Sequence, residues 1–153
     1  MSARGYAAIG LFNPKTPENV GGAMRACRVY GASMIAVTGA RDRWLRHPTD
    51  TQKTFRHVPT IRCDDLRSMI PFGCIPVAVD IIPDATPLPE YEHPQRAFYI
   101  FGPEDGTLGK EITDWCRDVI YVPMQGCMNL AASVNVVLYD RMAKNFQRDN
   151  EKD

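Results

Sequence analysis

The stretch 6–38, YAAIGLFNPKTPENVGGAMRACRVYGASMIAVT, decides the fold. Its two ends, YAAIGLF and SMIAVT, are short apolar runs of the kind that form buried strands. Between them, Thr16 supplies a capping hydroxyl and Pro17 suits the first position of a helix, which Gly31 would end. A strand, a helix and a second strand in this order predict a βαβ unit, in which the two strands are parallel.

The rest of the chain continues the alternation of strands and helices. It predicts an α/β fold, with a mainly parallel sheet flanked by helices. The basic stretch 41–62 reads as a loop with a short helix. We expect one domain over 1–148 and a charged tail over 149–153. Further strands are predicted at 75–82, 97–101 and 119–122, and helices at 64–70, 108–116 and 129–147. The inward side of the last helix would carry Leu130, Val134, Val137, Leu138 and Met142.

Composition excludes several classes of protein. Apolar residues make up 44% of the 153 residues, which is enough for a core and excludes a disordered chain. No apolar run is long enough to span a bilayer, and the N-terminus lacks a signal-peptide pattern, so we expect a cytoplasmic protein. Five cysteines without a CxxC pair argue against a disulfide framework or a zinc site. His47, His57 and His93 lie in polar stretches, and we expect surface histidines rather than a metal site.

The net charge of zero conceals two oppositely charged halves. Residues 1–62 hold ten basic and three acidic side chains, a net of +7, and residues 63–153 carry a net of −7. A neutral total argues against a strongly basic nucleic-acid binder, whereas the basic half is suited to phosphate groups. A solvated charged face is the alternative reading of the basic stretch. The candidate RNA-binding residues in it are Arg41, Arg43, Arg46, Lys53 and Arg56.

Three loops follow predicted strands, and ligands of parallel α/β sheets bind beyond the carboxyl ends of strands. The first loop leads into a helix that carries two glycines, 21 and 22, near its start. Glycine costs about 1 kcal/mol relative to alanine in a helix, so we expect something to pack close to the backbone there. Asn19, Gly22 and Arg25 follow at intervals of three and would share a helix face. Arg25 would then point into a polar cleft or into solvent.

The other two loops are 101–108, FGPEDGTL, and 122–130, VPMQGCMNL. The glycines of the first permit a close backbone approach to a ligand, although an ordinary tight turn has the same composition. In the second, Pro123 ends the strand and the next helix begins near Asn129. Met124 and Met128 could line an apolar slot for a purine ring or belong to the core.

Taken in order, these loops resemble the motifs of the SPOUT methyltransferases, specifically the SpoU/TrmH-type RNA ribose 2′-O-methyltransferases. The N-x-G-x-x-x-R-like motif matches Asn19 to Arg25. The F-G-x-E-x-x-G-L-like motif matches 101–108, with Gly106 displaced from the usual position. The third, I-P-M followed by S-x-N-L, matches 122–130. The sequence is most similar to the short single-domain tRNA members.

The resemblance implies a C-terminal trefoil knot whose loops form an S-adenosylmethionine pocket, usually at a homodimer interface. The resemblance further implies that RNA, and specifically tRNA, is the substrate, and that Arg25 is the principal catalytic residue. Arg25 would bind the adjacent phosphate and stabilise the developing alkoxide, since its guanidinium stays protonated. Asn19, Glu104 and Asn129 would complete the catalytic site. The implied cofactor-binding residues are Val79, Gly102, Val122, Met124, Cys127 and Leu130.

The sequence departs from the family pattern at two positions and leaves several functions open. Cys127 and Ala131 stand where the family has serine, and a thiol is a weaker hydrogen-bond donor than a hydroxyl. The rival of the same class is an rRNA 2′-O-methyltransferase. The rivals of other classes are a non-catalytic RNA-binding homologue and a cofactor-binding module that does not touch RNA.

Overall fold

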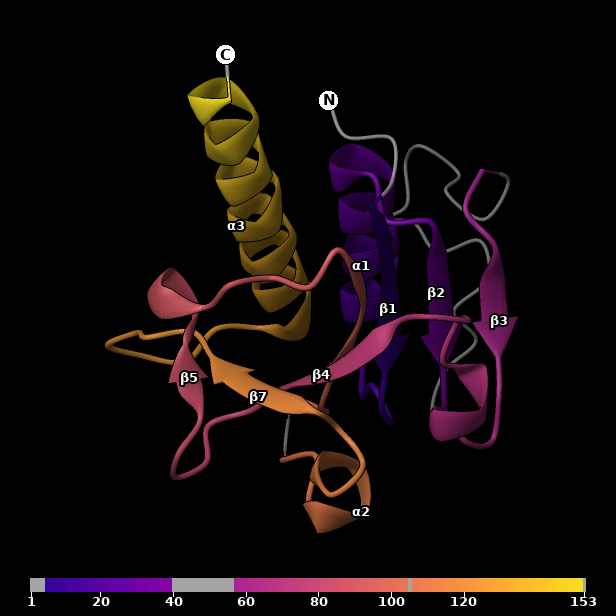
Figure 1. The fold of residues 1–153 in the computed structure, drawn as a ribbon. Coiled ribbons are helices and arrows are strands. Elements are labelled where there is room, and N and C mark those ends of the chain that lie inside the picture. Colours follow the sequence, from indigo (N-terminus) through magenta and orange to yellow (C-terminus); the bar gives the residue numbers. More distant parts are fainter. Residues whose placement is uncertain (1–4, 40–56, 105, 153) are drawn as a thin grey trace.

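The computed structural model describes residues 5–39, 57–104 and 106–152. These form a seven-stranded sheet in the order β3-β2-β1-β6-β4-β7-β5, in which every neighbouring pair is parallel (Figure 1). The predicted α/β class with a parallel sheet is confirmed. The strands are β1 (Tyr6–Leu11), β2 (Met34–Val37), β3 (Thr60–Arg62), β4 (Ile75–Val79), β5 (Thr86–Pro87), β6 (Arg96–Phe101) and β7 (Asp118–Tyr121). The helices are α1 (Pro17–Tyr30), α2 (Lys110–Thr113) and α3 (Leu130–Glu151), with 3₁₀ turns at Arg67–Met69 and Leu88–Glu90.

The βαβ unit forms as its sequence signals predict. Thr16 adopts an extended backbone, and its hydroxyl accepts a hydrogen bond from the Asn19 N–H at 3.4 Å. Gly31 ends α1 with a φ of 77°, a left-handed conformation that glycine adopts without steric cost. β1 and β2 then pair in parallel, with Ile9 opposite Ile35.

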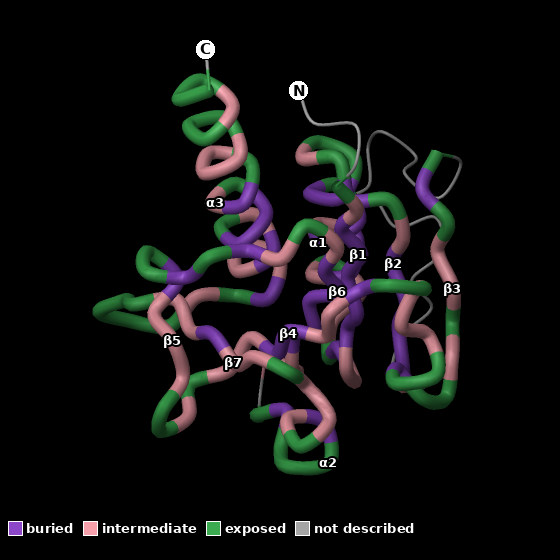
Figure 2. The backbone as a smooth tube through the Cα atoms, in the orientation of Figure 1, coloured by how far each residue is buried: buried purple, intermediate pink, exposed green. Residues whose placement is uncertain are grey.

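The late strands are inserted between earlier ones. β6 lies between β1 and β4, and β7 lies between β4 and β5. The central strands β1 and β6 are buried over almost their whole length (Figure 2). The trefoil knot that the family resemblance implies stays a prediction.

Helices α1 and α3 pack against each other on one face of the sheet. Gly22 makes their close approach possible, because a Cβ atom added there would lie only 2.7 Å from the Cβ of Ala131. The expected close packing at the α1 glycines is therefore confirmed, and the neighbour is α3. The core on this face includes Val20, Met24 and Cys27 of α1, and Leu130, Val134, Val137 and Leu138 of α3.

A smaller apolar cluster covers the opposite face of the sheet. Leu66, Leu108 and Ile112, from the segments around the 3₁₀ turn and α2, pack over Phe98 and Ile100 of β6. Since both faces of β6 are covered, its apolar residues run almost continuously, as is typical of a buried parallel strand.

Several predicted element bounds are wrong. The helix at 108–116 is reduced to α2, the one at 64–70 to a 3₁₀ turn, and the strand at 75–82 ends at Val79. β3 and β5 were missed because each is too short to show an apolar period. α3 continues to Glu151, so most of the charged tail is helical, and Met142 is 44% exposed instead of facing inward.

His93 is buried, contrary to the prediction of a surface histidine. Its Nδ1 lies 2.6 Å from the Tyr99 hydroxyl, and its Nε2 lies 2.7 Å from Asp140 Oδ2. Burial lowers the pKa of His93 although Asp140 opposes the shift, and burial raises the pKa of Tyr99 to about 12. The polar neighbours of His93 in the sequence suggest solvent, but Tyr99, six residues further on in β6, and Asp140, from the distant helix α3, satisfy the ring nitrogens internally.

The described ranges contain neither a membrane-spanning helix nor a cluster of metal ligands. No helix there combines the length and hydrophobicity that crossing a membrane requires. No group of three or more histidine, cysteine or acidic side chains there is arranged to hold a metal ion. His57 is exposed, and His47 lies outside the described residues.

Candidate active site

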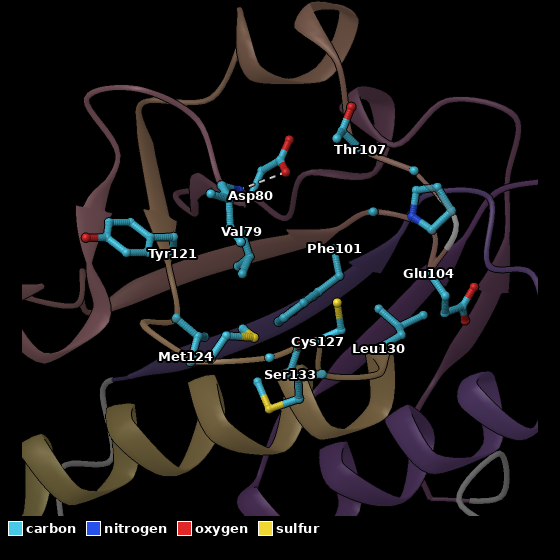
Figure 3. A pocket seen from close by; sticks show the side chains of 17 residues that line it. Val79, Asp80, Phe101, Glu104, Thr107, Tyr121, Met124, Cys127, Leu130 and Ser133 are labelled. Carbon is cyan, nitrogen blue, oxygen red and sulfur yellow. Dashed lines mark hydrogen bonds between the residues drawn. The ribbon is translucent and has the colours of Figure 1, made fainter.

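A cavity of about 280 Å³ opens at the carboxyl ends of the sheet strands (Figure 3). Its walls come from the segments that follow β4, β6 and β7, and from the first turn of α3. These are the positions where parallel α/β sheets bind ligands. Gly102 lets the loop after β6 fold back closely, because an added Cβ would meet the Leu108 backbone nitrogen at 3.2 Å.

The structure brings all the candidate cofactor-binding residues to this one cavity. In Figure 3, the side chain of Val79 points toward Met124 and Cys127 across the cavity. Leu130 is buried at the base, whereas Met124 and Cys127 are exposed. Their roles toward a cofactor stay predictions. The candidates that line the cavity are Val79, Gly102, Val122, Met124, Cys127 and Leu130.

Glu104 links the cavity to the start of α1. Its Oε1 accepts a hydrogen bond from Asn19 Nδ2 at 2.7 Å, and its Oε2 accepts one from the backbone N–H of Lys15 at 2.8 Å. Both carboxylate oxygens are thus engaged by the loop that precedes α1 and by its first turn. The first two sequence motifs, which are separated by more than half of the chain, are therefore held together by one side chain.

The remaining candidate catalytic residues occupy different places. Asn129 caps α3, where its Oδ1 accepts a hydrogen bond from the Ala132 N–H at 2.8 Å. Arg25 is exposed on α1 and is not among the residues that line the cavity. The three residues predicted to share one helix face therefore have different neighbours. Asn19 contacts Glu104, Gly22 packs on α3, and Arg25 is exposed to solvent.

The five candidate RNA-binding residues, at positions 41, 43, 46, 53 and 56, lie outside the described residues. The described chain leads into this segment from Gly39, just beyond the carboxyl end of β2. Because the sheet is parallel, Gly39 lies at the same end of the strands as the cavity loops. The Asn13 N–H donates to the Thr38 hydroxyl at 3.2 Å and joins β1 and β2 at this end.

Several cavity residues were missed by the sequence motifs. Asp80 is the most notable, because it is a carboxylate placed directly after β4. The strand predicted at 75–82 includes Asp80, which hides the residue from the search for polar side chains after strands. With the strand ending at Val79, Asp80 is the first residue of the loop and therefore a ligand candidate. The other lining residues outside the candidate set include Phe101, Thr107, Tyr121 and Ser133.

Comparisons with known proteins agree with this architecture. The rRNA methyltransferase from Sinorhizobium meliloti with bound AdoMet has a TM-score of 0.79 and 20% identity, over 90% of this chain and 56% of that one. The A. aeolicus TrmH/SpoU tRNA modifying enzyme has a TM-score of 0.82 and 18% identity, over 94% of this chain and 77% of that one. A further structure, described as giving insights into the 2-OH methylation of C/U34 on tRNA, has a TM-score of 0.74 and 22% identity. The match covers 90% of this chain and 95% of that one.

At these identities the structural likeness shows the shared fold. The chain spans less than two thirds of the length of several of the solved structures that it resembles, the S. meliloti rRNA methyltransferase among them. No curated protein sequence matches it. The sequence profile of the SpoU rRNA Methylase family, in contrast, matches residues 6–139, which is most of the chain and includes all three motif loops. The chain therefore belongs to the SpoU rRNA methylase family.

Proposed function

We propose that this protein is an S-adenosylmethionine-dependent RNA methyltransferase that methylates a ribose 2′-hydroxyl, with tRNA as the substrate. The observation that carries the proposal is that the second and third family motifs line one cavity, and that Glu104 of the cavity lining is joined to Asn19 of the first motif. The family match supports the chemistry. We also propose that the protein acts in the cytoplasm.

The cavity has the chemical character that this cofactor requires. Val79, Phe101, Val122 and Leu130 supply apolar surface for an adenosine group, and the glycines of the loops leave backbone groups accessible. Its acidic side chains suit a positively charged ligand. When bound, S-adenosylmethionine supplies an activated methyl group on a sulfonium.

The chain's own residues would position and polarise the RNA. Arg25, exposed on α1, would bind the phosphate beside the target ribose and stabilise the negative charge that develops on the 2′-oxygen. Glu104 would hold the Asn19 turn of α1 against the cavity, and so fix the distance between the phosphate site and the methyl donor. The proton of the hydroxyl would leave to the phosphate or to solvent, since a protonated guanidinium is not a base.

We propose tRNA and not rRNA because of the similar structure whose description refers to 2-OH methylation of C/U34 on tRNA. The similarity to that protein extends over 95% of its length, whereas it covers 56% of the S. meliloti rRNA methyltransferase. The resemblance of the motifs to the tRNA members points the same way.

Total tRNA that lacks 2′-O-methylation should acquire it from this protein. We expect incubation with isotope-labelled S-adenosylmethionine, followed by mass spectrometry of the nucleosides, to yield a labelled 2′-O-methyl nucleoside. Unmodified ribosomal RNA in a parallel reaction serves as the comparison. Product on ribosomal RNA alone would establish the rRNA alternative. Binding of either RNA without any product would establish a non-catalytic homologue.

A second proposal concerns assembly: the protein forms a homodimer through α3. This helix exposes an apolar stripe in which Tyr139 is 55% and Phe146 is 67% exposed. A groove of about 470 Å³ adjoins the stripe, and Val122 lines both this groove and the cofactor cavity. A second copy seated here would therefore lie next to the cavity. The stripe comprises Val136, Tyr139, Met142 and Phe146.

Sedimentation velocity should show one species with twice the 17.2 kDa chain mass. The double variant Met142→Glu/Phe146→Glu is expected to sediment as a monomer, because it places charges in the apolar interface. Gln147→Glu, which adds a charge beside the stripe on the same helix, should stay dimeric. A wild-type monomer at micromolar concentration would contradict the proposal.

A further inference from the structure

The cavity carries two carboxylates, Asp80 and Glu104, and its described lining contains no lysine, arginine or histidine. Neither carboxylate forms an ion pair within the described ranges of the chain. No cation of the described residues therefore neutralises their negative charges. Inside a cavity the interaction between charges is stronger than in bulk water, so the net charge of a ligand affects its affinity.

The two carboxylates differ in what they contact. Glu104 directs both oxygens to the α1 side, where Asn19 and the Lys15 backbone engage them. Asp80 accepts hydrogen bonds from the backbone N–H of Ile81 at 2.9 Å and of Leu108 at 3.3 Å. Figure 3 shows its carboxylate on the side of the cavity nearest to Thr107.

The hydrogen bonds of Asp80 fix its position without removing its charge. Both donors are neutral backbone groups, and one belongs to its own loop while the other belongs to the loop after β6. The side chain is half-buried, so water screens it only in part. It thus presents a fixed negative charge at the end of β4, between two of the motif loops.

We infer that Asp80 is a specificity-determining residue that makes the cavity prefer the positively charged methyl donor over the neutral product of its reaction. This inference rests on the proposed function. Methyl transfer converts the sulfonium of S-adenosylmethionine into the uncharged thioether of S-adenosylhomocysteine, and the two ligands are otherwise almost the same shape. A fixed carboxylate distinguishes them by charge, favouring entry of the donor and release of the product.

Isothermal titration calorimetry with Asp80→Asn tests the inference. Asparagine keeps the size and one acceptor oxygen but removes the charge. At low ionic strength we expect the dissociation constant for S-adenosylmethionine to rise about tenfold and that for S-adenosylhomocysteine to change less than about twofold. Asp84→Asn is the matched control, because Asp84 is an exposed acid of the same connection, does not line the cavity, and has a φ of 69° that asparagine tolerates.

The possible outcomes of these binding measurements distinguish a failure of the inference about Asp80 from a failure of the proposed function. An equal loss of affinity for both ligands would show that Asp80 only holds the loop through Leu108, and unchanged affinities would show that its charge is not sensed; either result overturns the inference. If Asp80→Asn does not fold, the wild type still decides, because added salt should weaken the binding of the donor more than that of the product. Equal salt effects would overturn the inference. A wild-type protein that binds neither ligand would overturn the proposed function itself.

Discussion

Arg25→Ala is expected to reduce methyl transfer to RNA about 100- to 1000-fold while the affinity for S-adenosylmethionine changes less than about twofold. Arg25 is exposed on α1 and does not line the cofactor cavity, so its removal should leave the cavity intact. What the variant loses is the charge that would hold the RNA phosphate and stabilise the alkoxide. Single-turnover rates with saturating RNA, measured beside calorimetric cofactor binding, separate the two effects.

Arg28 provides the matched control for Arg25. It is also an exposed arginine of α1, one turn further along the helix. Arg28→Ala should retain the rate within about threefold, because loss of one general phosphate contact weakens binding more than chemistry. Arg25→Lys should fall between the wild type and Arg25→Ala, since lysine keeps the charge without the planar pair of donors. A normal rate for Arg25→Ala would remove this residue from the mechanism.

Arg141→Ala is expected to lower the free energy of unfolding by about 3–5 kcal/mol. Arg141 is a buried residue of α3. Its Nη1 donates to the Pro94 carbonyl at 2.7 Å and to the Tyr99 hydroxyl at 3.1 Å, and its Nη2 donates to the Gln95 carbonyl at 2.7 Å. Alanine would leave these buried acceptors short of donors and remove a tie between α3 and the chain entering β6.

Thermal and denaturant unfolding measure this loss. For a chain of this size, the expected change corresponds to a decrease in the melting temperature of roughly 6–20 °C. Arg148→Ala is the control, because Arg148 is an exposed arginine of the same helix whose hydrogen bond goes to Asn145. That variant should lie within about 0.5 kcal/mol of the wild type. Equal stability of the two variants would contradict a structural role for Arg141.

The parts of the fold that are decided locally could be predicted from the sequence. The Thr16 cap, the proline at the first position of α1 and the glycine at its end all act within a few residues, and the structure confirms them. The order of the strands depends on contacts between distant segments and follows no local pattern. β3 and β5, at the two edges of the sheet, are too short to carry a hydrophobic period.

The sequence motifs predicted the part of the candidate site that their own residues form. The six cofactor candidates lie around one cavity, and Glu104 contacts Asn19. Asp80 and His93 show why other residues could not be assigned to their environment from the sequence. An acid at a strand end and a histidine in a polar, proline-bearing stretch resemble surface residues in sequence. Their environment comes from Leu108, which is 28 residues from Asp80, and from Asp140, which is 47 residues from His93, together with the nearby Tyr99.

The insertion of β6 between β1 and β4 sets an order of events during synthesis on the ribosome. Until residue 96 emerges, β1, β2 and β3 can pair with one another, but β4 and β5 have none of their native partners, which are β6 and β7. The apolar strand β4 must therefore wait, unpaired, for sequence that is translated after it. Non-local pairing of this kind folds slowly and exposes strand edges to other chains. β4 gains its first partner once β6 has been translated, and the second half of the sheet is complete only once translation has passed β7.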